Sequence, residues 1–256
     1  MTVMNINELA TIVDQAAFDA TAITQLSQNH QFNETEAYAI QTASLTKRYN
    51  RGEKFIGLKM GFTSRAKMEQ MGVHDMIWGR LTDAMLLEKG SSIDLSQYIH
   101  PRAEPEICFL IKKDIDQVLT LDNVKEYVEG VAAAIEIIDS RYQNFKFSLE
   151  DVIADNCSSA GLVIGDWLSP KTDIGNLKMV LEINHRPVQI GTSAAILDNP
   201  WESLVAATRL ADQYGQKISA GNYIMAGAAT PAVYLESSQS VQAKVETLGN
   251  VGFSVL

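Results

Sequence analysis

The sequence predicts an α+β fold with a mixed or antiparallel sheet. Helical patterns collect in the first fifty residues and in two later segments, around residues 122–131 and 199–214. Short apolar runs fill most of the rest, without the regular strand–helix alternation of a doubly wound sheet. We therefore expect one domain over residues 1–256, with a helical region at 1–52 and a β-rich catalytic core at 53–256.

The N-terminal region has clear helix-end signals. Asn33 can cap a helix, and Glu36 stands three positions later, where a capping box requires a Glu or Gln. Gly52 follows the last turn of this pattern, as glycine commonly does at a helix end. A short apolar run over residues 55–60 then begins the β-rich part.

Apolar runs predict the later strands, and polar or proline-containing segments separate them. The helix after residue 199 has Asn199 as its cap and Pro200 at its first position, where the missing N–H costs nothing. The predicted strands cover residues 104–112, 134–139 and 179–189, the last with a hairpin turn at 184–187, and shorter strands fill residues 222–256.

Composition excludes several classes of protein. The 256 residues are 46% hydrophobic and carry a formal net charge of −10, which argues against binding nucleic acid or an anionic membrane. Two cysteines imply no disulfide framework. The N-terminus lacks the basic and apolar regions of a secretory signal, and no apolar run approaches the ~20 residues of a membrane span. We expect a cytoplasmic protein.

Three glutamates interrupt apolar runs. Glu104 and Glu106 are two residues apart and so share one face of a strand, and Glu136 is flanked by isoleucines in a second strand. Buried charge is costly unless it is paired or binds a metal. With no obvious Lys or Arg partner in the same runs, the pattern indicates a hard cation such as Mg²⁺ or Mn²⁺. The alternative is that the two neighbouring glutamates lie on a solvated strand face.

Other charged residues are candidates for binding a substrate. Lys59 stands alone in a glycine-punctuated apolar stretch and can hold an anion or a carbonyl oxygen, or can simply extend to solvent. Arg141 can bind a carboxylate or form a surface pair with Asp139. The polar residues 155–159 form a turn or a site rim. No nucleophilic-serine, Walker A, dinucleotide or zinc motif is present.

Three segments carry a family resemblance. Residues 57–64 (GLKMGFTS), 100–106 (HPRAEPE) and 152–156 (VIADN) resemble the hydratase/decarboxylase family of the catechol meta-cleavage pathway, within the fumarylacetoacetate hydrolase superfamily. The resemblance implies a rolled mixed β-sheet core. It also implies that Glu104, Glu106 and Glu136 bind Mg²⁺ (or Mn²⁺) and that Lys59 lies beside a 2-oxo acid.

Residues 63–68, 138–142 and 144–147 look more like the decarboxylases of this family than its hydratases. This implies a lyase that converts 2-oxohex-3-enedioate (4-oxalocrotonate) to 2-hydroxypenta-2,4-dienoate and CO₂ in aromatic catabolism. Lys146 or Arg141 would then position the departing carboxylate. The residues assigned to catalysis are Lys59, Arg141 and Lys146, and those assigned to substrate contacts are Lys59, Arg141, Lys146, Asp155 and Ser158.

Other activities stay open at this point. A hydratase of 2-hydroxypenta-2,4-dienoate would use the same metal end of the site, and a catalytically silent subunit that binds a 2-oxo acid is a non-enzymatic alternative. Hydrolysis of acylpyruvates is a further superfamily reaction. The resemblance also implies a homo-oligomer that can form a complex with the hydratase of the pathway.

Overall fold

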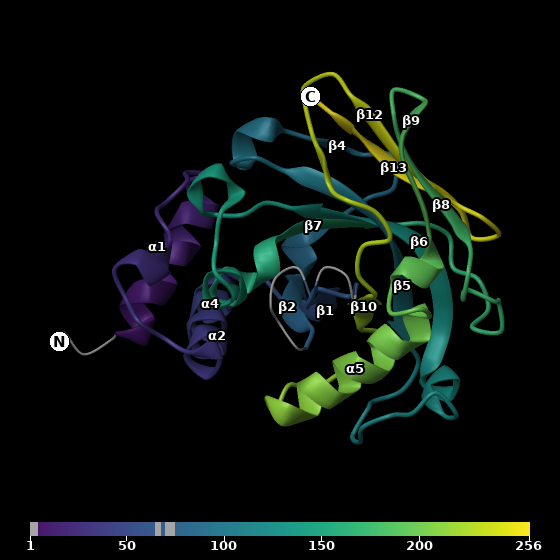
Figure 1. The fold of residues 1–256 in the computed structure, drawn as a ribbon, viewed down its shortest axis with the longest axis horizontal. Coiled ribbons are helices and arrows are strands. Elements are labelled where there is room, and N and C mark those ends of the chain that lie inside the picture. The colour runs from purple at the N-terminus through teal and green to yellow at the C-terminus, as the bar shows by residue number, and fades with distance from the viewer. Residues whose placement is uncertain (1–4, 65–67, 70–74) are drawn as a thin grey trace.

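The computed structural model describes residues 5–64, 68–69 and 75–256 and has the predicted α+β fold (Figure 1). Within these residues, no helix is both long and apolar enough to cross a membrane. The helices are α1 (Ile6–Phe18), α2 (Glu34–Asn50), α4 (Leu149–Ala154) and α5 (Pro200–Gln213). The strands are β1 (Phe55–Gly61), β2 (Ile77–Thr82), β3 (Leu86–Leu87), β4 (Ser92–Ile93), β5 (Arg102–Ile111), β6 (Val128–Ile138), β7 (Ser159–Ile164), β8 (Lys178–Ile183), β9 (Arg186–Thr192), β10 (Tyr223–Met225), β11 (Val233–Tyr234), β12 (Ser240–Val245) and β13 (Gly249–Val255).

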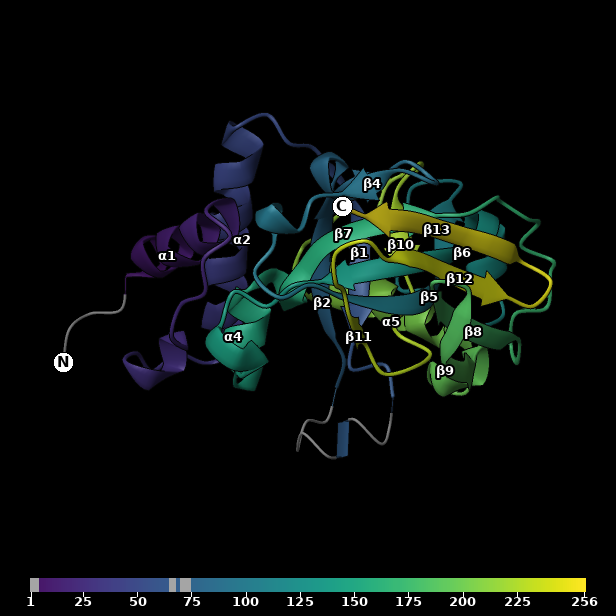
Figure 2. The same cartoon turned by 90° about the horizontal axis from the view of Figure 1, so that it is seen from above.

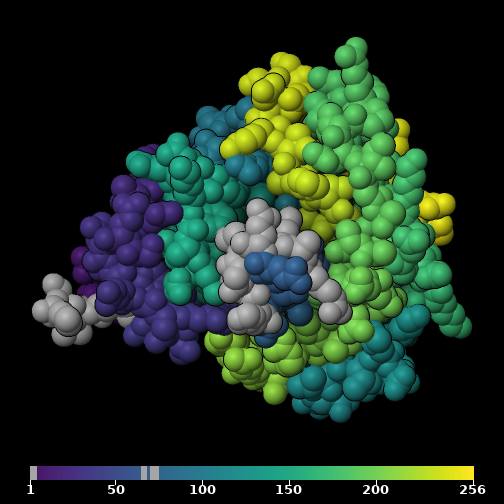
Figure 3. All heavy atoms as spheres, viewed as in Figure 1, coloured from purple at the N-terminus to yellow at the C-terminus, as the bar shows by residue number. Residues whose placement is uncertain are grey.

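The strands form two mixed sheets. The larger has the order β2-β1-β10-β5-β6-β7-β3, with β11 also paired to β5, and the smaller has the order β4-β13-β12-β8-β9. Strands β12 and β13 pack against β6, so the smaller sheet covers one face of the larger (Figure 2). Helices α1, α2 and α4 gather on the other side of the molecule, where their surfaces adjoin in the space-filling view (Figure 3).

The predicted helix ends are confirmed. The Asn33 side chain accepts a hydrogen bond from the Glu36 N–H at 3.0 Å, and the Glu36 carboxylate accepts one from the Asn33 N–H at 2.8 Å. Gly52 has a φ of 107°, a conformation that glycine adopts without strain. Asn199 caps α5 through the Trp201 N–H, and Pro200 is its first residue.

Strands β5 and β6 form the long central ladder of the larger sheet. Ile107, Phe109 and Ile111 occupy one face of β5, as predicted, and are at most 2% exposed. They belong to a buried cluster that runs from α1 to β13. This shared core supports our proposal that residues 1–256 form a single domain. The opposite face of β5 carries Glu104 and Glu106.

The prediction of a helix around residues 122–131 is wrong. Only the short 3₁₀ turn Val124–Tyr127 is helical, and β6 already begins at Val128. Lys125 and Glu126 favour a helix, but Val128 and Val131 already pair with Ile111 and Phe109 of β5 and are at most 2% exposed. Tertiary pairing overrides a weak local preference.

Candidate metal and substrate site

Three buried carboxylates gather on one face of the β5–β6 pair. Glu104 and Glu106 project from the same face of β5, and Glu136 of β6 lies directly opposite Glu104 in the register. The three residues are 8%, 1% and 0% exposed, respectively. One oxygen from each lies within 4.8 Å of the others. The structure therefore brings together the three glutamates that the sequence singles out.

Several of these oxygens lack a hydrogen-bond partner among the described residues. Glu106 Oε2 accepts a hydrogen bond from the Gly227 N–H at 2.8 Å. Among the described residues, Glu106 Oε1 and both oxygens of Glu136 have no hydrogen-bond partner. Buried carboxylates are costly in this condition. Oxygen donors clustered this closely are what a hard divalent cation binds, so the residues fit Mg²⁺ or Mn²⁺.

Lys59 reaches the cluster from a distant strand. Strands β10 and β5 separate β1 from β6, so the curl of the sheet brings the side chains together. Lys59 Nζ lies 3.1 Å from Glu136 Oε2, an ion pair without hydrogen-bond geometry, and donates a hydrogen bond to the Cys157 carbonyl at 3.0 Å. The residue is 5% exposed. Its ammonium group therefore lies among carboxylates and does not extend to solvent.

Burial and like charge shift the titration of these groups. Burial raises the pKa of Glu136 to about 7, although Lys59 beside it lowers the pKa. Burial and the charge of Glu136 raise the pKa of Glu106 well above its ordinary value. Burial alone would lower the pKa of Lys59, but the nearby carboxylates, Glu136 first, raise it. The ammonium therefore stays charged at neutral pH, and in the absence of metal Glu106 and Glu136 bind a proton more readily than an ordinary glutamate does.

We expect the metal-free protein to lose stability as the pH rises from about 4.5 to 7. In this window the folded state holds a proton on Glu136 that the unfolded chain has released, so ionisation favours unfolding. The loss is on the order of 3 kcal/mol for a shift of this size. Denaturant unfolding in EDTA at several pH values measures it. The Glu136→Gln protein is the control and should show a flatter profile; an equally steep profile would contradict the assignment.

A cavity of about 410 Å³ opens beside the carboxylates. Lys59 and Glu104 are among its charged lining residues, and Phe145, Phe147 and Val152 are among its apolar ones. The other lining residues are Met60, Gly61, Phe62, Thr63, Ser64, Ile77, Arg102, Ile138, Cys157, Ser158, Ala228, Pro231 and Ala232. This size suits a small organic ligand.

Arg102 is a lining residue that the sequence reasoning missed. Its guanidinium carbon lies 3.8 Å from the centre of the Phe145 ring and 4.0 Å from that of Tyr234, whose hydroxyl it contacts. Its Nε is buried without a hydrogen-bond partner among the described residues. A signal was present, because Arg102 is two residues before Glu104 and so shares the face of β5 with both glutamates.

Two other contacts of the site had no usable signal. The Gly227 N–H that binds Glu106 and the Cys157 carbonyl that binds Lys59 are backbone groups. Every residue carries such groups, and only the folded chain shows which of them face a site.

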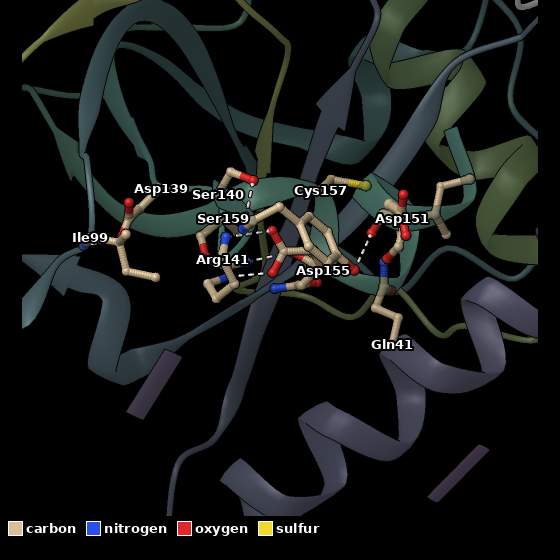
Figure 4. A network of polar contacts seen from close by, with 12 residues as sticks. Gln41, Ile99, Asp139, Ser140, Arg141, Asp151, Asp155, Cys157 and Ser159 are labelled. Carbon is tan, nitrogen blue, oxygen red and sulfur yellow. Dashed lines mark hydrogen bonds and ion pairs between the residues drawn. The ribbon is translucent and has the colours of Figure 1, made fainter. Parts of the chain in front are cut away.

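Of the remaining predicted site residues, only Ser158 lines the cavity. Its buried Oγ has no hydrogen-bond partner within the described chain. Arg141 and Asp155 lie outside the cavity lining and form a buried ion pair with each other (Figure 4). Lys146 is exposed and also outside the lining, although both of its neighbours contribute to it. Of the predicted stretch 63–68, residues 65–67 lie outside the described residues.

The chain belongs to the fumarylacetoacetate hydrolase family. The family model for the fumarylacetoacetate (FAA) hydrolase C-terminal region matches residues 60–256. A 4-oxalocrotonate decarboxylase from a Pseudomonas species is 52% identical over 251 residues, which cover 98% of each chain. A 2-hydroxypent-2,4-dienoate hydratase from Pseudomonas putida is 37% identical over 200 residues, covering 76% of this chain and 90% of the hydratase.

Solved structures agree with these sequence relatives. The structure of 4-oxalocrotonate decarboxylase from Pseudomonas putida G7, complexed with magnesium and adipate, superimposes with a TM-score of 0.94 at 33% identity. The superposition covers 98% of this chain and 97% of the other. The rolled mixed-sheet fold expected from the resemblance is confirmed.

Proposed function

We propose that this protein is a Mg²⁺-dependent decarboxylase that converts 2-oxohex-3-enedioate to 2-hydroxypenta-2,4-dienoate and CO₂. The observation that carries the proposal is a cavity lined by Lys59, Glu104 and the cation Arg102, with Glu106 and Glu136 clustered beside Glu104. This charge pattern suits a substrate with a carboxylate at each end. The decarboxylase that is 52% identical over nearly the full chain supports it.

Glu104, Glu106 and Glu136 would hold the ion. When bound, Mg²⁺ would act as a Lewis acid toward the 2-oxo acid end of the substrate. The residues around it have distinct tasks. Gly227 fixes one carboxylate by its N–H, and the neighbouring strands keep the oxygens together before the ion arrives. Preorganised ligands of this kind lower the cost of binding.

Lys59 would stabilise charge that develops during the reaction. Loss of the distal carboxylate leaves an electron pair at C5, and conjugation through C3=C4 carries it to the C2 oxygen. A buried ammonium beside that oxygen stabilises the developing negative charge far more strongly than an ammonium in water does. Because Glu136 and the Cys157 carbonyl hold Nζ, little reorganisation is needed when the charge appears. No nucleophilic side chain is required.

The distal carboxylate would lie toward Arg102 and the aromatic wall. Arg102 takes the place that the sequence reasoning gave to Arg141 and Lys146, because neither of those residues lines the cavity. The Phe145 and Phe147 rings line the cavity and would make that end more apolar. An apolar surrounding favours the step, since the carboxylate loses its charge as CO₂ forms.

We expect Arg102→Leu to raise the KM for 2-oxohex-3-enedioate by about tenfold to a hundredfold, the value of a charge-assisted contact. The KM for a 2-oxo monocarboxylate of similar length should change much less. Steady-state kinetics with both substrates measures the difference. An equal rise in the KM values of both substrates would instead place Arg102 at the 2-oxo acid end that the two substrates share.

One assay tests the proposed reaction. The purified protein is incubated with 2-oxohex-3-enedioate and Mg²⁺, and released CO₂ is measured alongside the absorbance of the dienol product. The proposal expects CO₂ that depends on Mg²⁺ and disappears in EDTA. Hydration of 2-hydroxypenta-2,4-dienoate without any CO₂ would identify a hydratase, the activity of the 37% identical relative. If the protein catalyses neither reaction but still binds the 2-oxo acid, it is a catalytically silent subunit.

The remaining parts of the proposal concern the setting of the enzyme. We propose a cytoplasmic homo-oligomer that passes its product to the hydratase of the same pathway, because a dienol is unstable in water. Size-exclusion chromatography with light scattering tests the oligomer, and co-purification with the hydratase tests the complex.

A further inference from the structure

A strained turn over residues 156–158 contacts the Lys59 side chain. Asn156, Cys157 and Ser158 have φ values of 50°, 53° and 60°, so three successive non-glycine residues adopt the left-handed conformation. This conformation costs about 1–2 kcal/mol for Cys157 and for Ser158, and less for Asn156, because asparagine tolerates it. The turn can persist only if its surroundings hold it, and such strain is concentrated at functional sites.

Arg141 holds both ends of this turn. Its guanidinium donates to the carbonyl of Asp155, just before the turn, and to the carbonyl of Ser159, just after it, the latter at 3.1 Å. It also pairs with the Asp155 carboxylate, whose other oxygen accepts the Arg141 backbone N–H at 3.0 Å. Arg141 is 3% exposed and Asp155 is fully buried. Figure 4 shows this arrangement of the pair.

Two neighbouring strands fix the turn from its other sides. The Asn156 side chain accepts a hydrogen bond from the Arg80 N–H of β2 at 2.8 Å and donates one to the Arg80 carbonyl at 2.9 Å. The Ser158 carbonyl accepts one from the Asp139 N–H at 2.8 Å, just after β6. The turn is therefore anchored to β2 and to the residue that follows β6.

The middle of the turn faces the site. The Cys157 carbonyl accepts the hydrogen bond from Lys59 Nζ at 3.0 Å, and this carbonyl and Glu136 fix the ammonium group from two directions. The unpartnered Oγ of Ser158 lines the cavity next to it. A shift of the turn would therefore move the acceptor that aims Lys59.

We propose that Arg141 and Asp155 are a positioning pair that sets the place of the Lys59 ammonium through the Cys157 carbonyl. Neither residue contacts the substrate. The guanidinium is suited to the task because one planar fork reaches a carboxylate and two carbonyls at once, which a lysine ammonium on a flexible stem does not reproduce. The inference rests on the proposed decarboxylation for its kinetic readout.

The test compares Arg141→Lys with Arg51→Lys. Arg51 makes a bidentate pair with Asp14 between α1 and the end of α2, with both contacts at 2.7 Å, and takes no part in the site. The Arg141→Lys protein should lower kcat by about tenfold to a hundredfold, the cost of misplacing a reacting group by roughly 1 Å. KM and Mg²⁺ affinity should change less than threefold. Arg51→Lys should leave kcat unchanged.

A merely structural role predicts a different result. Arg141→Lys would then unfold at a lower temperature but keep normal kcat per folded molecule, and this would overturn the proposal. If Arg141→Lys does not fold, the double variant R141M/D155L removes the pair without leaving a lone buried charge, and the same comparison applies.

A crystal structure of the variant separates this inference from the proposed function. The proposal expects the Cys157 carbonyl and Lys59 Nζ to lose their contact, whatever reaction the wild type performs. An unmoved turn and ammonium would overturn it. Absence of CO₂ release by the wild type, with the turn displaced in the variant, would overturn the decarboxylase assignment alone.

Discussion

Glu106→Gln should abolish Mg²⁺-dependent turnover while the metal-free protein stays at least as stable as the wild type. Glutamine keeps the shape and can still accept the Gly227 hydrogen bond, but it removes a charge that a divalent cation needs. It also removes a buried charge, since burial and then repulsion from Glu136 raise the pKa of Glu106 in the wild type. Lewis-acid stabilisation is worth several kcal/mol, so kcat should fall at least about 10³-fold.

The matched control is Glu182→Gln. Glu182 is also a buried strand glutamate, 6% exposed, but it lies on β8 of the smaller sheet and pairs with Lys244. Calorimetric titration with Mg²⁺ and unfolding in EDTA complete the comparison. Full activity of Glu106→Gln in the presence of EDTA would exclude the metal site.

Lys59→Met should lower kcat by about 10²–10³-fold, the loss expected for one preorganised donor at a developing charge. Mg²⁺ affinity should change less than tenfold, because two effects oppose each other. Removing the ammonium relieves its repulsion of the ion, but it also removes the charge that lowers the pKa of Glu136. Methionine fills most of the space of the lysine side chain, so the fold should persist.

The control for this variant is Lys244→Met, which breaks the lysine–glutamate pair on the smaller sheet. Single-turnover kinetics and equilibrium binding of Mg²⁺ separate the chemical step from metal binding. If Lys59→Met retained the wild-type kcat, Lys59 would have only a structural role in pairing with Glu136.

Local patterns were enough to predict that the three glutamates are buried and lie together. Alternation along β5 places Glu104 and Glu106 on one face, and the flanking isoleucines mark Glu136 as buried. The same alternation contained Arg102, but its importance depends on Phe145 and Tyr234, which arrive from elsewhere in the chain.

The distal end could not be predicted in this way. Lys146 precedes Phe147, which lines the cavity, yet Lys146 is exposed, because successive side chains point in opposite directions in extended backbone such as that of Lys146. Arg141 has the chemistry of a carboxylate ligand, and Asp155, fourteen residues later, uses that capacity. Sequence spacing does not show whether Arg141 will pair with its neighbour Asp139 or with the more distant Asp155.

The separation of Lys59 from its partners along the chain has a consequence for folding. Lys59 meets Glu136 and the Cys157 carbonyl, and Glu106 meets the Gly227 N–H, so these contacts close loops of many tens of residues. Long-range closures form late, after local contacts have repaid part of their entropy. A growing chain must therefore be synthesised beyond residue 227 before the metal site is complete. Mg²⁺ would then bind selectively to finished molecules and stabilise the whole fold by mass action.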